Sequence, residues 1–428
     1  MASSDGALRD TERRVLDAVD VSAVVEDLRA LVALPSTGGS AAEADVQRWC
    51  ADRLVALGGE VDLWPLDLTA LRADPDYPQE EVHRDAAYGC VGTWRTESGG
   101  MPALVLAGHT DVVPPGDLDA WTSDPYTLRV AGGRAHGRGA CDMKGGLAAV
   151  LGAVTAVRAA GVRLRRPLAV HCVVAEEDGG LGAFATLRRG HTGAVCVLAE
   201  PTAGTVVPAN AGSLTFRLEV PGLATHGSTR TRGSSALDAF LPVLQALRDL
   251  EAERNTDVPP VLEGVEMPYP LSVGVVRAGD WASTVPDLLV AEGRYGVRLG
   301  EPVEQARAAL ESAVDAACRA DPWLAEHPVR VTWPGGVFAS GVLPEAHPLL
   351  PAVRAAVEDV TGEAPAVRGA PYGSDLRLYV AAGVPTLQYG PGDVGVAHAA
   401  DEYVEVADLA RTARVYALLV ARLCGAGT

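Results

Sequence analysis

The chain has 428 residues, 48% apolar and 21% charged, a balance typical of globular proteins, and its length predicts two domains. A formal charge of −19 argues against nucleic-acid and anionic-membrane partners, since both bind clustered positive charge. No apolar run approaches the roughly 20 residues that span a bilayer, and residues 1–21 are too polar for a signal peptide, so we expect a cytoplasmic protein.

Seven cysteines are scattered along the chain without a Cys-x-x-Cys pair. An odd number at irregular spacing is unlike a disulfide framework and unlike a thiolate zinc site. We therefore expect free thiols.

The first half of the chain alternates helical stretches with short apolar runs. Apolar residues at helical spacing over 21–57 predict two helices, separated by a turn at 35–40. Residues 61–63 begin a strand that Pro65 keeps short or at a sheet edge. Later runs are continuously apolar, as in strands buried on both faces, and two predicted helices lie between them. The runs are 102–107, 168–174 and 194–198, and the helices are 143–160 and 180–189. This alternation predicts an α/β core.

The middle of the chain has a different pattern, typical of a small open-faced α+β sandwich. Its expected strands are 213–220, 271–276, 288–297 and 329–333, and its expected helices are 234–254 and 304–320. After Pro344 the core-like pattern resumes with a helix over 347–361, the stretch 376–382 and a strand over 386–389. The middle unit is therefore expected to be inserted into a larger domain.

Metal-ligand side chains follow the predicted strands, where α/β proteins build their sites. His109 and Asp111 come after the run 102–107, and Asp111 can accept the second ring proton of His109. Asp142 lies at the start of a predicted helix, where a capping role would also explain it. Taken alone, His109 and Asp111 fit a surface histidine beside an acid better than a metal ligand, and capping explains Asp142 as well as metal binding does.

Three further places complete the set. Glu176, Glu177 and Asp178 are adjacent carboxylates after a buried strand, and they repel one another unless a cation lies there. Glu200 follows the next strand, and His398 lies in a polar loop near the C-terminus. Two histidines and several carboxylates without a thiol suit zinc, or cobalt and manganese as substitutes.

These motifs, in this order and approximate spacing, resemble the co-catalytic metallohydrolases that include acetylornithine deacetylase, succinyl-diaminopimelate desuccinylase, aminoacylase and carboxypeptidase G. The resemblance extends from about Val21 to the C-terminus. It implies a zinc-peptidase-like α/β catalytic domain with a mixed sheet between helices, residues 1–210 and 340–428. It also implies an inserted α+β lid and dimerisation domain, residues 211–339, and hence a homodimer.

The resemblance further implies two Zn²⁺ ions and a role for each motif. Asp142 would bridge both ions. His109 and Glu200 would complete one site, and Glu177 and His398 the other. Glu176 would be the general base, and Asp111 would orient His109. The family often has a cis peptide after the bridging Asp, here Asp142–Met143.

Other residues would act on the substrate. His226 stands where the family places a lid-domain histidine that reaches the partner subunit's active site. Ser283 replaces an asparagine of the family's Asn-x-Ile-Pro segment, and Arg294 does not fall cleanly on the family's arginine. Gly373, Ser374 and Asp375 resemble the family's substrate loop.

Within the family, the chain resembles the acetylornithine-deacetylase-like branch more than the carboxypeptidase branch. The resemblance implies an enzyme that hydrolyses linear amides. A hydroxide shared by the two ions would remove an acetyl, formyl or succinyl type of acyl group from the nitrogen of a small amino-acid-like molecule. A dipeptidase or carboxypeptidase of the same family has the same apparatus and remains an alternative. A non-catalytic binding paralogue is a third, although such a protein has no need of Glu176.

Overall fold

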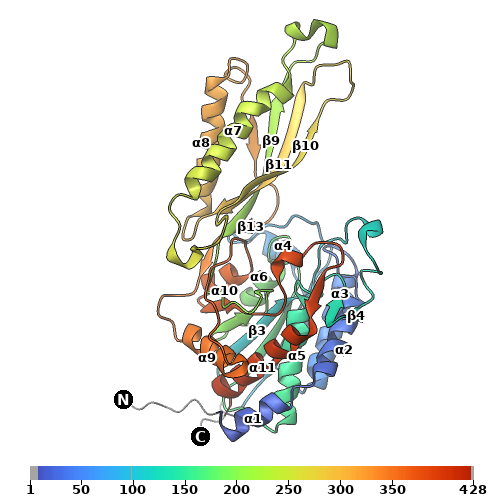
Figure 1. Ribbon diagram of the computed structural model, residues 1–428, viewed down its shortest axis with the longest axis vertical. Helices are drawn as coiled ribbons and strands as arrows, with labels where there is room; N and C mark the ends of the chain where they lie inside the picture. Colours follow the sequence, from blue (N-terminus) through green and yellow to red (C-terminus); the bar gives the residue numbers. More distant parts are fainter. Residues whose placement is uncertain (1–7, 98, 426–428) are drawn as a thin grey trace. The chain divides into compact units, whose positions relative to one another are not determined.

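The computed structural model describes residues 8–97 and 99–425, which fold as two compact units (Figure 1). The first unit comprises the described residues up to Pro208, then Val342–Arg368, and the chain from Leu378 onward. The second comprises Ala209–Gly341 and the short segment Gly369–Arg377. The mixed α/β architecture expected from the sequence is confirmed.

A six-stranded mixed sheet forms the centre of the first unit, in the order β1-β2-β6-β3-β7-β15. Its strands are β1 (Glu60–Pro65), β2 (Tyr88–Trp94), β3 (Leu104–His109), β6 (Leu168–Val173), β7 (Cys196–Leu198) and β15 (Thr386–Gln388). Strand β3 is parallel to β6 and β7, and β15 is parallel to β7. Strands β1 and β2 run antiparallel at one edge, where the sequence places a short strand ending near Pro65.

Helices cover both faces of this sheet, so every residue of β3 and β6 is buried, as their continuous apolar runs predict. On one face, Leu104 and Leu106 join a core with helices α2, α3, α5 and α11. On the other face, Val91 and Val174 pack with α6. The helices with residues in this unit are α1 (Asp10–Asp17), α2 (Val21–Val32), α3 (Ala42–Ala56), α4 (Leu68–Arg72), α5 (Lys144–Ala159), α6 (Leu181–Arg188), α9 (Leu349–Thr361), α10 (Leu376–Ala381) and α11 (Val406–Leu423).

A small antiparallel sheet in the first unit joins two distant parts of the chain. Its order is β16-β5-β4, with β4 at Arg129–Ala131, β5 at Arg134–His136 and β16 at Tyr403–Glu405. Tyr403 pairs with His136. The loop before β16 and the loop after β5 therefore lie together.

The second unit has an antiparallel sheet in the order β10-β11-β9-β12, with β13 also paired to β9. The strands are β9 (Gly212–Pro221), β10 (Leu271–Ala278), β11 (Leu288–Val297), β12 (Arg330–Thr332) and β13 (Val337–Phe338). Strand β9 alternates buried and half-buried residues, and its buried side packs with α7 (Ala236–Arg254) and α8 (Val303–Ala320). One covered face and one open face account for the alternation seen in the sequence.

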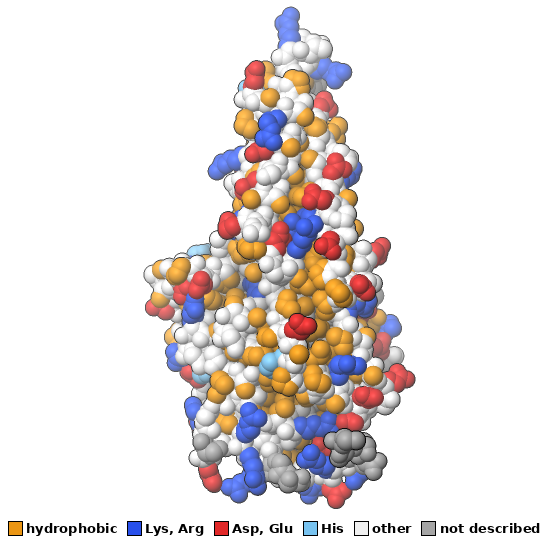
Figure 2. Space-filling model, turned by 90° about the vertical axis from the view of Figure 1, so that its left-hand side faces the viewer, with side chains coloured by type: hydrophobic (Ala, Val, Ile, Leu, Met, Phe, Trp, Pro, Cys, Tyr) orange, Lys and Arg blue, Asp and Glu red, His pale blue; other side chains and the backbone are white. Residues whose placement is uncertain are grey.

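Acidic and basic side chains are interspersed on the face drawn in Figure 2, so there the acidic excess is distributed rather than gathered. None of the helices in the described part of the chain combines the length and the apolar character that crossing a membrane requires.

Candidate metal centre

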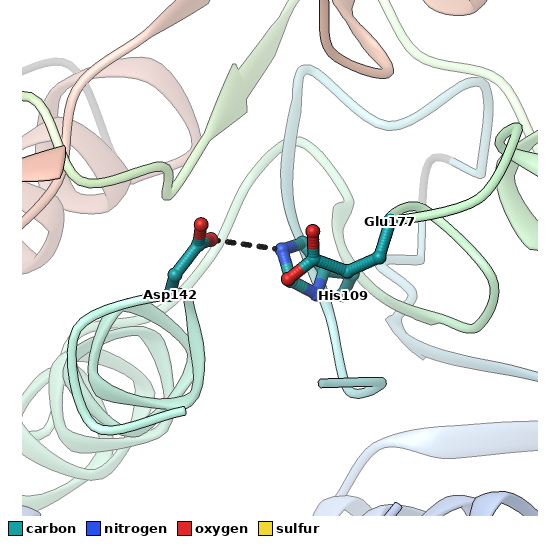
Figure 3. A group of neighbouring side chains, drawn as sticks. All are labelled: His109, Asp142 and Glu177. Atoms are coloured by element: carbon teal, nitrogen blue, oxygen red, sulfur yellow. Dashed lines mark hydrogen bonds and ion pairs between the residues drawn. The ribbon is translucent and has the colours of Figure 1, made fainter. Parts of the chain in front are cut away.

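Side chains from three separate elements point toward one another in the first unit (Figure 3). His109 ends β3, Asp142 precedes α5, and Glu177 lies in the turn after β6. One ligand atom from each lies within 4.8 Å of those of the other two, a spacing that could hold a metal ion. Parallel strands end at one edge of the sheet, which is why residues after β3 and β6 meet.

His109 is buried and contacts the cluster through one nitrogen. Its Nε2 lies 3.1 Å from Asp142 Oδ1 and 4.0 Å from Glu200 Oε2. Its Nδ1 lies 3.0 Å from the backbone oxygen of Asp111, while the Asp111 carboxylate is 3.6 Å away. The carbonyl of Asp111 is thus the nearer partner of the ring, a distinction that the sequence does not reveal. With Nδ1–H donating to this carbonyl, Nε2 is the nitrogen left for a metal.

The Asp142 carboxylate lies between two imidazoles, because its Oδ2 is 3.4 Å from Nε2 of His398. His398 Nε2 is also 3.2 Å from Glu177 Oε1. His398 is half-exposed, whereas Asp142 and Glu177 are nearly buried. The cluster therefore opens to solvent on the His398 side.

The cluster favours positive charge at its centre. Hydrogen bonds to Asp142 and Glu177 raise the pKa of His398 to about 10. Burial opposes the charged form of His109, but the bond to Asp142 and nearby carboxylates hold its pKa well above the ordinary value. Burial also acts against ionised Asp142, yet bonds from the two histidines keep its pKa below the ordinary value. A divalent cation would displace these histidine protons and supply the same charge.

Close packing brings the helix turn that follows Asp142 against the strand end that precedes Glu200. A Cβ at Gly146 would lie 2.0 Å from the backbone oxygen of Ala199, so only glycine lets the first turn of α5 approach the end of β7. Lys144 Nζ donates to the carbonyls of Leu31 and Leu34, which fastens this turn to the end of α2. The peptide bond between Asp142 and Met143 is cis, as the resemblance implies.

Asp111 also organises the turn that carries the acidic run. Its Oδ1 accepts from the backbone N–H of Glu176 at 3.2 Å, and its Oδ2 from that of Glu177 at 3.1 Å. Both Asp111 and Glu176 are buried. The position of the proposed general base therefore depends on Asp111.

The third acid of the run, Asp178, turns away from the cluster. Its carboxylate binds Arg84, with Nη1 to Oδ2 at 2.7 Å, and Arg84 also binds Glu43. Arg84 is fully buried between these two carboxylates. Part of the charge repulsion noted in the sequence is thus relieved by arginine. No pattern in the sequence points to Arg84.

The lid histidine expected from the resemblance, His226, lies in the second unit and is exposed. It begins a 3₁₀ helix, Gly227–Arg232, and its Nδ1 accepts from the backbone N–H of Ser228 at 3.2 Å. A backbone N–H can only donate, so a neutral ring carries its proton on Nε2. Ser283 is nearby, since its carbonyl accepts from the N–H of Gly227 at 2.6 Å.

The remaining predicted substrate residues also belong to the second unit. Arg294 is half-buried on β11. Gly373 packs against Phe338, and Ser374 and Asp375 are buried. Ser374 Oγ accepts from the N–H of Leu376, which gives it a capping role at the start of α10.

Sequence reasoning also missed two buried residues beside the cluster, Arg138 and Glu402. Both stand within the motifs that carry Asp142 and His398, but neither has the spacing of a ligand.

Comparison with known proteins identifies the family. The family model for "Peptidase family M20/M25/M40" matches residues 105–422. A succinyl-diaminopimelate desuccinylase of Gluconacetobacter diazotrophicus is 33% identical over 76% of this chain and 82% of its own. The N-formyl-4-amino-5-aminomethyl-2-methylpyrimidine deformylase of Bacillus subtilis is 27% identical, over 86% and 87%. An acetylornithine deacetylase of Yersinia pestis is 28% identical, over 94% and 97%.

Solved structures show the same fold. The dipeptidase Dug1p of Saccharomyces cerevisiae superposes with a TM-score of 0.78 at 14% identity, over 96% of this chain and 98% of that one. Human carnosine dipeptidase 1 superposes with a TM-score of 0.72 at 14% identity, over 96% and 99%.

The fold and the histidine–carboxylate cluster define a metal-dependent hydrolase of the mixed α/β class. The chain belongs to peptidase family M20/M25/M40, and it is a hydrolase that acts on amide bonds.

Proposed function

We propose that this protein removes an acyl group from the nitrogen of a small amino-acid-like molecule. The observation that carries the proposal is the Asp142 carboxylate, whose two oxygens face His109 and His398 respectively. Relatives named for desuccinylation, deformylation and deacetylation all release an acyl group from nitrogen, which supports this reaction class.

The donor set fits two divalent ions. Asp142 would serve both, His109 and Glu200 would hold one, and His398 and Glu177 the other. Imidazole and carboxylate ligands without thiolate suit Zn²⁺, with Co²⁺ or Mn²⁺ as substitutes. When bound, such ions supply a water of lowered pKa and polarise the scissile carbonyl.

The chain's own residues would then move the proton and stabilise charge. Glu176, held by Asp111, would accept a proton from the attacking water and pass it to the leaving nitrogen. His226 would donate Nε2–H to the developing oxyanion. Ser283, Arg294 and the 373–375 segment would contact the rest of the substrate.

A homodimer through the second unit would let His226 act on the partner's substrate. Strand β10 is at the edge of its sheet and pairs with β11 alone among the described strands. Val276 on this strand and Trp281 after it are 50% and 74% exposed. An apolar edge of this kind is suited to pairing with a second copy. Sedimentation of the wild type and of Val276→Lys tests this, and a monomeric, fully active wild type would rule out the role in trans.

We also propose a cytoplasmic location. All seven cysteines are buried and free, which agrees with a reducing compartment.

Free-amine release from metal-loaded enzyme tests the function. N-acetyl, N-formyl and N-succinyl amino acids are compared with dipeptides, with and without chelator. Chelator-sensitive turnover within one acyl series is expected. Cleavage of dipeptides alone would instead identify a peptidase, and two bound metals without turnover on either class would favour a binding paralogue.

A further inference from the structure

A buried ion pair lies next to the proposed metal ligands in the first unit. Arg138 Nη1 is 2.5 Å from Glu402 Oε2, and each side chain is only 1% exposed. Arg138 precedes Asp142 in the loop after β5, and Glu402 follows His398 in the loop before β16. The pair thus joins the two loops that carry these ligands.

The second oxygen of Glu402 holds the backbone at Asp142. Oε1 accepts from the N–H of Cys141 at 2.8 Å and from the N–H of Asp142 at 3.0 Å. Both of these N–H groups lie in the turn before α5. The Glu402 carboxylate therefore fixes the direction from which Asp142 enters the cluster.

The second terminal nitrogen of Arg138 holds the backbone at His398. Nη2 donates to the carbonyl of His398 at 3.2 Å and to that of Pro114 at 3.3 Å. His398 has φ of 63° and Asp401 of 56°, a region that residues with side chains adopt only when their surroundings hold them there. The carbonyl contact is one such restraint.

These contacts assign the pair a function other than stability. A buried ion pair often stabilises a fold no more than apolar residues of the same volume would, because both charges are desolvated. Here the hydrogen bonds of the pair run to the backbone at Asp142, at His398 and in the loop after Asp111. We propose that Arg138 and Glu402 are positioning residues that hold Asp142 and His398 in register and thereby set the metal affinity. This inference rests on the proposed metal ligands.

The test compares Glu402→Gln with a matched control. The carboxamide keeps the size of the side chain but cannot accept hydrogen bonds on both sides, so it loses either the N–H groups or Arg138. The control is Glu301→Gln in the second unit. Glu301 also pairs with a buried arginine, Arg254, and also accepts a backbone N–H, from Arg298 at 2.8 Å.

The readouts are the Zn²⁺ dissociation constant, from competition with a chromogenic chelator, and thermal unfolding of the metal-free protein. Glu402→Gln should bind Zn²⁺ about 10–100-fold more weakly than the wild type, as is typical when a group that orients metal ligands is lost. Glu301→Gln should bind Zn²⁺ with the affinity of the wild type, even if its melting temperature falls as much as that of Glu402→Gln.

Wild-type Zn²⁺ affinity in a folded Glu402→Gln variant would overturn the inference and leave the proposed function intact. A wild type that binds no Zn²⁺ would overturn both. Should Glu402→Gln not fold, Arg138→Lys decides by the same readout. Lysine keeps the charge beside Glu402 but cannot also reach both carbonyls, so weaker Zn²⁺ binding supports the inference and unchanged binding rejects it.

Discussion

The backbone N–H of Glu177 donates to the carboxylate of Asp111 at 3.1 Å, which connects the end of β3 to the turn after β6. The other oxygen of Asp111 serves Glu176 in the same way. The carboxylate therefore positions a proposed ligand and the proposed base together.

Asp111→Asn should lower the free energy of unfolding by about 1–3 kcal/mol, because the amide nitrogen cannot accept and one buried N–H loses its partner. Urea unfolding of the metal-free protein measures this. Asp124→Asn is the control, since exposed Asp124 accepts the N–H of Tyr126 at 3.0 Å. Equal effects at both positions would contradict a special role for Asp111.

Glu176→Gln should keep its metal and lose turnover by about 10²–10⁴-fold, the usual contribution of a general base. Metal content by mass spectrometry and kcat on the best substrate are measured on the same sample. Glu177→Gln is the comparison, and it should lose metal as well as turnover. Unchanged turnover in Glu176→Gln would reject the assignment of the base.

Arg84→Met should destabilise the first unit by about 3–5 kcal/mol, because Glu43 and Asp178 would stay buried without their cation. Burial already raises the pKa of Glu43 to about 7 in the presence of Arg84. Without the arginine, the folded state would favour the protonated form of both carboxylates. The loss of unfolding free energy caused by the substitution should therefore grow as pH rises from 5.5 to 8.

Urea unfolding at both pH values checks this, with Arg53→Met as the control. Arg53 pairs with Asp27, and their side chains are 25% and 12% exposed, so water can partly replace the lost bond. A loss at Arg84 no larger than at Arg53 would show that Arg84 is not needed to neutralise this site.

His171 should make the protein less stable in acid. Burial and the nearby His191 lower its pKa to about 3, and its Nδ1 lies 2.9 Å from the hydroxyl of Tyr379. The folded pKa is below the unfolded value near 6.5, so the stability of the neutral form is complete above pH 6.5 and is lost as pH falls toward 3.

The measurement is the unfolding free energy of metal-free wild type minus that of His171→Gln, between pH 4 and 7. This difference should fall by about 1.4 kcal/mol per pH unit below 6.5, because unfolding takes up one extra proton. Contributions from groups that His171 does not influence are the same in both proteins and cancel in the difference. A difference independent of pH would show that His171 takes up its proton as readily in the folded state as in the unfolded state, and would contradict the lowered pKa.

Pattern alone predicted much of the fold. Continuous apolar runs at β3 and β6 indicate strands buried on both faces, and the alternation at β9 indicates a strand buried on one face. Both patterns can be read from neighbouring residues in the sequence. Strand β2 was missed, since Gly89 and Gly92 interrupt its pattern. A Cβ at Gly89 would lie 2.2 Å from the Trp64 ring, and one at Gly92 would lie 3.1 Å from Leu54. Glycine is needed at these positions because side chains from elsewhere in the chain pack closely against the backbone there.

The sequence by itself determined the family and the order of the histidine and carboxylate motifs, because ligand types at strand ends can be read locally. Only the tertiary structure decided how those groups are held. The Asp178 carboxylate pairs with Arg84, and the Asp111 carboxylate accepts the N–H groups of Glu176 and Glu177. The pair Arg138–Glu402 binds the backbone at Asp142 and at His398. These contacts join residues that are far apart in the chain. Neither the spacing nor the composition of a sequence shows which two charged side chains will be buried next to each other.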